Sequence, residues 1–201
     1  MKINFLGTGS SLGIPVITCN CEVCNSKDPR DKRLRTSVYI EADDQHIIID
    51  ISPDFRSQVL HAGINRIDSV LITHEHRDHI GGLDDIRAYN FVQQAAINVY
   101  TSERVRKSIE SSHEYIFVQE RYPGVPELNF FDVHQTPFKI KNITVIPINA
   151  VHYRTAGYEL PVQGFRLQDF TYLTDIKYID DSELEKAYGS QVLVLNVLEF
   201  I

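Results

Sequence analysis

Residues 74–79 hold three histidines and one aspartate within six positions: His74, His76, Asp78 and His79. Imidazole nitrogen and carboxylate oxygen are ligands that Zn²⁺, Mn²⁺ and Fe²⁺ accept. The alternative is a charged loop with solvated histidines, but so dense a run of histidines argues against it. The pattern therefore predicts a metal site in this stretch.

A strand and a helix would position these side chains. The apolar run at residues 69–72 is typical of a short buried strand, and the spacing of Ile80, Leu83 and Ile86 indicates a helix. The candidate ligands would thus occupy a strand-to-helix turn, a place where scaffolds commonly present functional side chains.

A second group of potential ligands is the C-x-C-x-x-C cluster of Cys19, Cys21 and Cys24. Three thiolates this close can take three corners of a tetrahedral zinc site. The alternative is three buried thiols, but the polar surroundings favour a structural zinc held by a cysteine-cluster loop over residues 19–24. No cysteine is left to join distant segments, which favours a reducing, cytoplasmic compartment.

The length and charge of the chain narrow the function classes. With 201 residues, 43% of them hydrophobic, residues 1–201 are expected to form a single domain. The formal net charge of −7 counts against a general binder of polyanions. No apolar run approaches the ~20 residues of a membrane span, so a membrane is not an expected partner.

Hydrophobic periodicity and turn residues predict the remaining elements. Strands are expected over residues 2–6, 36–41, 46–51, 97–100, 161–167 and 170–174, in two short pieces within 138–148, and as a buried strand over 191–197. Helices are expected over residues 54–61, 80–94, from 102 onward, and over 182–188 with Ser182 as N-cap.

The run His74-x-His76-x-Asp78-His79 resembles the HxHxDH signature of the metallo-β-lactamase superfamily of metal-dependent hydrolases. The small-residue loop at 7–11 and the cysteine cluster resemble the phosphodiesterase branch of the carbon–phosphorus lyase pathway. The resemblance runs from residue 7 to residue 197. It implies an α+β fold, the four-layer αββα sandwich, in which two packed sheets have helices outside them.

The resemblance also implies a set of metal ligands for two divalent ions, which could be Zn, Mn or Fe. One ion would be held by His74, His76 and His152, the second by Asp78 and His79, and Asp175 would bridge both. Asp50 would orient the metal-binding loop, and Asp78 and Asp50 are the expected catalytic groups. Two such ions bring the pKa of a bridging water toward ~7 and so supply hydroxide for hydrolysis.

This sequence departs from the superfamily pattern near its end. Relatives continue through another helix and strand to a last metal-binding histidine, which is absent here. The fold is therefore expected to lack its last helix and strand, either as a truncated chain or as a natural variant. The second ion would then be one ligand short, and the structural zinc would lack the C-terminal histidine that completes it in relatives.

The expected function is a metal-dependent hydrolase that acts on a small cyclic or nucleotide-like phosphodiester. One alternative is a tRNA-processing endonuclease-like enzyme, against which the acidic charge counts. The other is a metal-binding protein with little catalysis, because the last ligand is missing. The expected partner is a small-molecule phosphodiester. A homodimer is the assembly to be considered.

Overall fold

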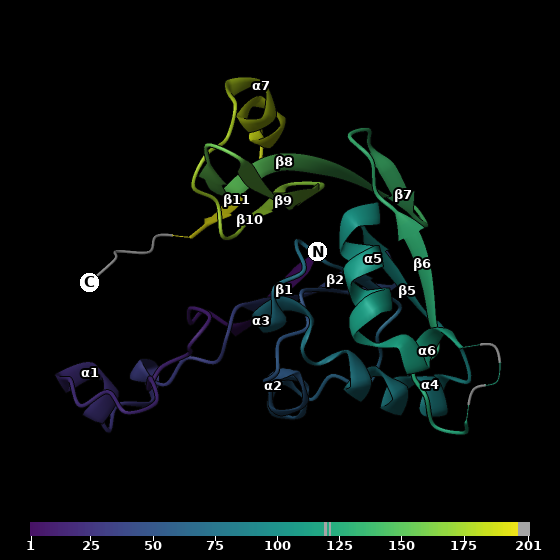
Figure 1. The fold of residues 1–201 in the computed structure, drawn as a ribbon, viewed down its shortest axis with the longest axis horizontal. Coiled ribbons are helices and arrows are strands. Elements are labelled where there is room, and N and C mark those ends of the chain that lie inside the picture. The colour runs from purple at the N-terminus through teal and green to yellow at the C-terminus, as the bar shows by residue number, and fades with distance from the viewer. Residues whose placement is uncertain (119, 121, 197–201) are drawn as a thin grey trace.

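The computed structural model describes residues 1–118, 120 and 122–196, and it places their strands in two sheets (Figure 1). The first sheet has the strand order β1-β2-β3-β4-β5-β6. Its strands are β1 (Lys2–Gly7), β2 (Ser37–Ala42), β3 (Gln45–Ile49), β4 (Ser69–Leu71), β5 (Ile97–Thr101) and β6 (Leu128–Asp132). Strands β1 to β3 pair antiparallel, and β3 to β6 pair parallel.

The second sheet has the order β11-β10-β9-β8-β7. Its strands are β7 (Phe138–Ile140), β8 (Ile143–Thr155), β9 (Tyr158–Leu167), β10 (Phe170–Leu173) and β11 (Val192–Leu195). Strands β7 to β10 form antiparallel pairs, whereas β11 pairs parallel with β10 and lies at the edge.

Helices lie outside the two sheets (Figure 1). They are α1 (Glu22–Asn25), α2 (Phe55–Ala62), α3 (Arg77–Ile80), α4 (Arg87–Gln93), α5 (Glu103–Ser112), α6 (Glu114–Phe117) and α7 (Asp181–Leu184). Single 3₁₀ turns follow at Pro29–Asp31, Leu83–Ile86 and Glu185–Ala187. The segment that carries α1 projects away from the sheets, and α7 lies beyond the second sheet.

Side-chain alternation along the strands creates the layers. In β3, Ile48 packs toward the helices with Phe55 of α2, whereas its neighbours Ile47 and Ile49 pack toward Phe165 of the second sheet. Successive side chains of a strand point to opposite faces, so an all-apolar strand is expected where both faces are covered. A smaller cluster around Leu173 joins the second sheet to the segment after α7. The αββα sandwich expected from the sequence is therefore confirmed.

The helix expected over residues 80–94 is interrupted at Gly81 and Gly82. The Gly82 amide donates to the Ile51 carbonyl at 3.0 Å, and a Cβ at Gly82 would lie 2.4 Å from the Ser52 carbonyl oxygen. The chain after β3 thus packs directly against the backbone at this point. A continuous helix is the wrong expectation, because this close contact takes precedence over the apolar periodicity.

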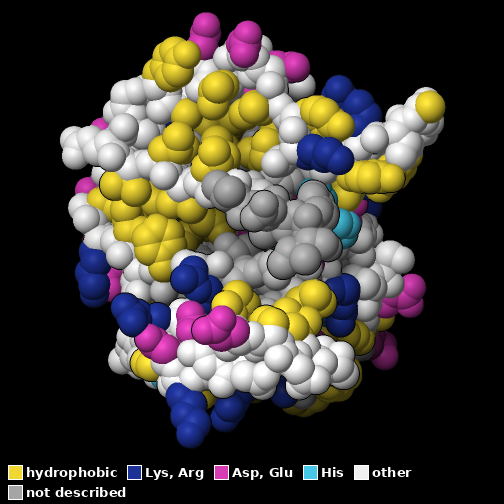
Figure 2. Space-filling view, turned by 90° about the vertical axis from the view of Figure 1, so that its left-hand side faces the viewer, with side chains coloured by type: hydrophobic (Ala, Val, Ile, Leu, Met, Phe, Trp, Pro, Cys, Tyr) yellow, Lys and Arg dark blue, Asp and Glu magenta, His cyan; other side chains and the backbone are white. Residues whose placement is uncertain are grey.

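Two further expectations near the end of the chain are corrected. The helix there begins at Asp181 with Asp180, rather than Ser182, at the N-cap position. Strand β11 is exposed rather than buried: Leu193 and Leu195 expose 51% and 53% of their surface. Figure 2 views the molecule from the left-hand side of Figure 1 and shows that hydrophobic side chains gather on this face. Residue 197, the expected end of this strand, lies outside the described residues.

None of the helices in the described part of the chain is both long and apolar enough to cross a membrane.

Gly164 in β9 tests the packing of the second sheet. A Cβ there would lie 2.2 Å from Leu173 Cδ2 and 2.9 Å from the Tyr172 carbonyl oxygen, and the backbone atom cannot move cheaply. We expect Gly164→Ala to lower the free energy of unfolding by about 1–3 kcal/mol, measured by urea denaturation. Gly157→Ala is the control: it has open space around its Cβ and should change stability by less than about 0.5 kcal/mol. Equal stability of the two variants would contradict the packing described here.

Candidate metal centre

Four strand-associated segments bring the candidate ligands together. His74 and His76 lie on the loop after β4, and Asp78 and His79 are in α3 directly behind it. His152 comes from β8 of the second sheet, and Asp175 follows β10. The ring centroids of His74 and His76 are 4.7 Å apart, and that of His152 lies 5.3 Å from His74 and 5.2 Å from His76.

The potential ligand atoms form two overlapping groups around His74. One group is His74, His76 and His152, and the other is His74, His79 and Asp175; within each, the ligand atoms lie within 4.8 Å of one another. His79 Nε2 lies 3.3 Å from a carboxylate oxygen of Asp78 and 3.3 Å from one of Asp175. All six metal ligands expected from the sequence are therefore neighbours in space.

The Asp50 carboxylate contacts this cluster through Thr73 and His79. It is fully buried and accepts a hydrogen bond from the Thr73 amide at 2.9 Å. His79 Nδ1 lies 2.7 Å from its other oxygen. The Thr73 hydroxyl donates to Asp50 at 2.9 Å and lies 3.0 Å from His74 Nδ1. Asp50 thus fixes His79 directly and His74 through Thr73.

The far nitrogens of these two rings are suited to metal. Among the described residues, the Nε2 atoms of His74 and His79 are buried without a hydrogen-bond partner, an arrangement that is costly unless a ligand satisfies them. Two ligand atoms that bind one zinc at about 2.0–2.1 Å in a tetrahedron lie about 3.3–3.4 Å apart. The separations of 3.3 Å from His79 Nε2 to a carboxylate oxygen of Asp78 and to one of Asp175 match that spacing. The residues present therefore fit a divalent ion.

The electrostatics of the cluster follow from burial and charge. Burial and the neighbouring His79 lower the pKa of His74 to about 2, so its ring is neutral. Burial opposes protonation of His79, but Asp50, Asp175 and Asp78 outweigh it and raise its pKa well above the ordinary value. Burial favours neutral Asp78 and Asp175, yet His79 outweighs it and holds both carboxyl pKa values below the ordinary range.

Two of the carboxylates occupy an unusual backbone conformation. Asp50 has φ +62° and Asp175 has φ +56°. Left-handed backbone costs roughly 1–3 kcal/mol for a residue other than glycine, and such residues cluster at functional sites. Aspartate tolerates this conformation better than most residues, so a sharp turn and a carboxylate coincide at the end of β3 and again just after β10.

His152 was expected to follow a strand, but it lies inside the 13-residue strand β8. Val151 pairs with Pro161 and Tyr153 with Leu160, so His152 is an extra residue in a β-bulge. A bulge redirects side chains and is common beside active sites. The position of His152 depends on this register shift, which hydrophobic periodicity does not reveal.

Open clefts lie on two sides of the ligand cluster. The first, the Gly-loop cleft, has a volume of ≈ 230 Å³ and is lined by residues 7–11, Asp78, Asp175 and residues 194–196. The second, the hairpin cleft, has a volume of ≈ 650 Å³ and is lined by His76, His152, Tyr153, Tyr158, Leu160 and Lys177. The ligand cluster thus contributes side chains to both clefts.

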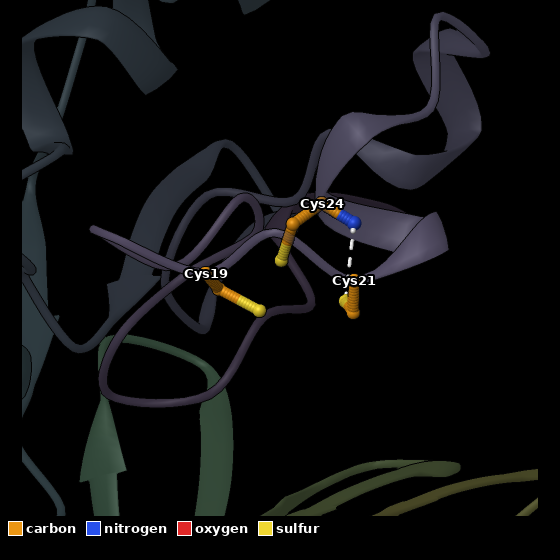
Figure 3. Close-up of side chains that lie close together, drawn as sticks. All are labelled: Cys19, Cys21 and Cys24. Atoms are coloured by element: carbon orange, nitrogen blue, oxygen red, sulfur yellow. Dashed lines mark hydrogen bonds between the residues drawn. The ribbon is translucent and has the colours of Figure 1, made fainter.

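The cysteines come together on the projecting segment (Figure 3). The three Sγ atoms lie within 4.8 Å of one another. The amide of Cys24 donates to Cys21 Sγ at 3.5 Å, and the Val16 amide donates to Cys24 Sγ at 3.4 Å. The hydrogen bond from Cys24 lowers the pKa of the Cys21 thiol. The segment is not wholly a loop, because Cys24 lies on the one-turn helix α1. This geometry suits three thiolate ligands of one ion.

Sequence reasoning missed the residues that support the ligands. Thr73 has the bridging role described above. Glu75 forms an ion pair of 2.6 Å with Arg104 at the start of α5. The backbone amide of Gln163 in β9 donates to the backbone carbonyl of Thr73 at 3.0 Å. This hydrogen bond joins the second sheet to the loop. These contacts depend on tertiary packing, and no local pattern marks them.

Comparison with known proteins places the fold and site in a family. The family profile described as a beta-lactamase superfamily domain matches residues 45–200, so the chain belongs to the metallo-β-lactamase superfamily. The crystal structure of a diphosphatase from the PhnP family superposes with a TM-score of 0.84 and 34% identity, covering 95% of this chain and 72% of that one. The resemblance noted in the sequence is therefore confirmed.

The chain is also similar to a curated protein and to a second solved structure. The chain is 41% identical over 202 residues to an octanoyltransferase of Porphyromonas gingivalis, a match that covers 100% of this chain and 40% of the relative. Zinc-bound PqqB from Methylobacterium extorquens has a TM-score of 0.75 and 16% identity, covering 96% of this chain and 72% of that one, which shows the shared fold alone. The chain spans about half or less of the length of the curated relatives that it matches.

Thr73→Val tests the orientation of His74. Valine keeps the shape of threonine but removes the hydroxyl between Asp50 and His74. We expect metal affinity to fall roughly 10- to 100-fold, as when other residues that orient metal ligands are lost, measured by competition with a chelator. Thr171→Val is the matched control, because Thr171 is also buried and its hydroxyl contacts Ser190 at 2.6 Å. Equal metal affinity of both variants would refute the role of Thr73.

Proposed function

We propose that this chain is a metal-dependent hydrolase that cleaves a small cyclic or nucleotide-like phosphodiester. The observation that carries the proposal is the pair of buried Nε2 atoms of His74 and His79, unpartnered among the described residues and surrounded by further ligands. A buried polar atom of this kind calls for a bound partner, and the neighbouring donor set suits Zn²⁺, Mn²⁺ or Fe²⁺.

The residues divide between two divalent ions. His74, His76 and His152 would hold one ion, Asp78 and His79 the other, and Asp175 would contact both. When bound, such ions acidify water and polarise a phosphoryl oxygen. Asp50 keeps the rings of His79 and, through Thr73, His74 in the orientation that presents Nε2.

Asp78 is the residue we assign to proton transfer. Its carboxylate lines the Gly-loop cleft, and His79 holds its pKa below the ordinary value, so it is ionised at neutral pH. An ionised carboxylate in the cleft can accept a proton from attacking water at one of its oxygens. The hydroxyls of Thr8, Ser10 and Ser11 line the same cleft and can donate to phosphate oxygens.

A phosphodiester is the substrate class best supported. The PhnP-family relative is named a diphosphatase, which denotes hydrolysis at phosphorus, and the loop of small hydroxyl residues suits phosphate oxygens. The octanoyl transfer named for the Porphyromonas gingivalis protein is not proposed here, because this chain corresponds to only 40% of that protein.

Two alternatives make different predictions. A tRNA-processing endonuclease would need a surface that attracts RNA, and the net charge of −7 counts against it. A metal-binding protein with little catalysis would bind ions at the same ligands but would not hydrolyse phosphodiesters. Metal analysis together with hydrolysis of bis(p-nitrophenyl) phosphate separates the second alternative from our proposal.

His76→Ala tests the active site. His76 is an exposed side chain outside the hydrophobic clusters, so the variant should fold. We expect loss of metal and a decrease of more than about 100-fold in hydrolysis of bis(p-nitrophenyl) phosphate, since losing a ligand should cost more than losing the residue that orients one. His61→Ala is the control, because His61 is an exposed histidine of α2. Wild-type activity in His76→Ala at full metal content would overturn the assignment.

The cysteine cluster, which we propose holds a structural zinc, is tested by Cys21→Ser. The variant should lose about one zinc per chain and unfold at a lower temperature, whereas the ions at the histidines still bind. His76→Ala should show the reverse pattern, keeping the cysteine-bound zinc. Unchanged zinc content in Cys21→Ser, measured by mass spectrometry of bound metal, would contradict this proposal.

A further inference from the structure

The hairpin cleft is formed by one face of the β8–β9 hairpin. In this antiparallel pair Tyr153 is opposite Leu160, and Thr155 is opposite Tyr158. Paired residues lie on the same face of a sheet, and so do residues two apart along a strand. Tyr153, Tyr158 and Leu160 therefore share one face, and all three line the cleft.

The bulge in β8 joins this face to the metal ligands. In a regular strand His152 and Tyr153 would point to opposite faces. Because His152 is the extra residue of the bulge, both side chains line the same cleft. The aromatic wall consequently begins directly beside a candidate metal ligand.

The two tyrosines are exposed, but Tyr158 is held in place. Tyr153 and Tyr158 expose 47% and 52% of their surface, whereas Leu160 at the base of the cleft exposes 5%. Arg104 donates to the Tyr158 hydroxyl at 3.3 Å, and the same guanidinium pairs with Glu75 of the metal-binding loop at 2.6 Å. The ring is thus anchored to the site through its hydroxyl, while about half of the residue's surface stays exposed.

A cation completes the cleft. The Lys177 amide donates to the Val151 carbonyl at 2.9 Å, which fixes this residue next to His152. Other cations nearby are already paired: Arg154 with Glu159 at 2.7 Å, and Arg104 with Glu75. In the described part of the chain Lys177 has no ion pair, and its ammonium group lies 5.8 Å from the ring centre of Tyr178.

We propose that the hairpin cleft binds a nucleotide portion of the substrate. The base stacks on the rings of Tyr158 and Tyr153, and Lys177 neutralises a second phosphate beside the one that is cleaved. Aromatic faces bind every base by stacking, and a lysine attracts phosphate as a point charge. The volume of ≈ 650 Å³ lies within the roughly 300–1,000 Å³ usual for small-molecule sites.

This inference rests on the proposed function and names its substrate class. The substrate is a nucleotide ester or anhydride that carries a base and at least two phosphates. The cleaved phosphate would lie at the metal ligands, between the hairpin cleft and the Gly-loop cleft. Bases differ little in stacking on tyrosine, so base identity should influence binding only modestly.

Binding of AMP, ribose 5-phosphate and adenosine, measured by isothermal titration calorimetry, tests the inference without relying on catalysis. AMP should bind more tightly than ribose 5-phosphate, which lacks the base, and than adenosine, which lacks the phosphate. Tyr158→Ala should weaken AMP binding roughly 5- to 150-fold, toward the affinity of ribose 5-phosphate, because only Tyr153 is then left to stack on the base. Tyr158→Phe keeps the ring and should stay within about 3-fold of wild type for AMP, since an exposed neutral hydrogen bond contributes little.

Lys177→Ala should weaken AMP by up to about 5-fold and leave adenosine unchanged, with the difference shrinking at high salt. Lys139→Ala, which removes an exposed lysine from β7, is the control and should have no effect. AMP that binds no better than ribose 5-phosphate to wild type, or equally well to Tyr158→Ala, overturns the inference.

Hydrolysis of bis(p-nitrophenyl) phosphate keeps the two proposals distinguishable. Hydrolysis that depends on His76, without any preference for AMP among the ligands, leaves the proposed function intact and refutes the nucleotide cleft. The absence of such hydrolysis refutes the proposed function even where the tyrosine variants alter AMP binding.

Discussion

The buried carboxylate of Asp50 is the interaction on which the site depends. An unpaired charge at a fully buried position would cost several kcal/mol, so its hydrogen bonds to Thr73 and its contact with His79 are a requirement of burial. The same bonds determine the direction of two imidazole rings. Its φ of +62° turns the chain out of β3 just where the loop after β4 arrives. A single residue therefore couples the end of one strand to the ligands carried by the next.

The second sheet supplies the remaining candidate ligands. His152 lies in β8 and Asp175 follows β10, whereas the other candidate ligands lie in the loop after β4 and in α3. The hydrogen bond from the backbone amide of Gln163 to the Thr73 carbonyl connects the two sheets at this point. The candidate ligands come together only when the sheets are packed, so a bound ion would stabilise the packing of the two sheets. The apolar contact of Ile47 and Ile49 with Phe165 is thus part of what builds the site.

The sequence predicted those parts of the structure that local patterns encode. The ligands at 74–79 are adjacent in the chain, β3 is a continuous apolar run, and α2 has a glycine stop at Gly63, which has φ +64°. His152 was found through the family resemblance, but its bulge was not, because a register shift depends on the partner strand. The break at Gly82 and the bridging role of Thr73 arise from tertiary contacts. For the same reason the hairpin cleft, built from both β8–β9 and the segment after β10, could not be read from the sequence.

The residues that support the candidate ligands and the tyrosines of the hairpin cleft differ in how tightly the surrounding structure holds them. Asp50, Thr73 and His79 are buried and mutually constrained, so a substitution there disturbs several hydrogen bonds at once. Tyr153 and Tyr158 are half exposed on a hairpin, and Arg104 ties the hydroxyl of Tyr158 to the site. Substitutions at such positions cost little stability. A substrate preference set at the hairpin, as we propose, could therefore change without disturbing the candidate ligands.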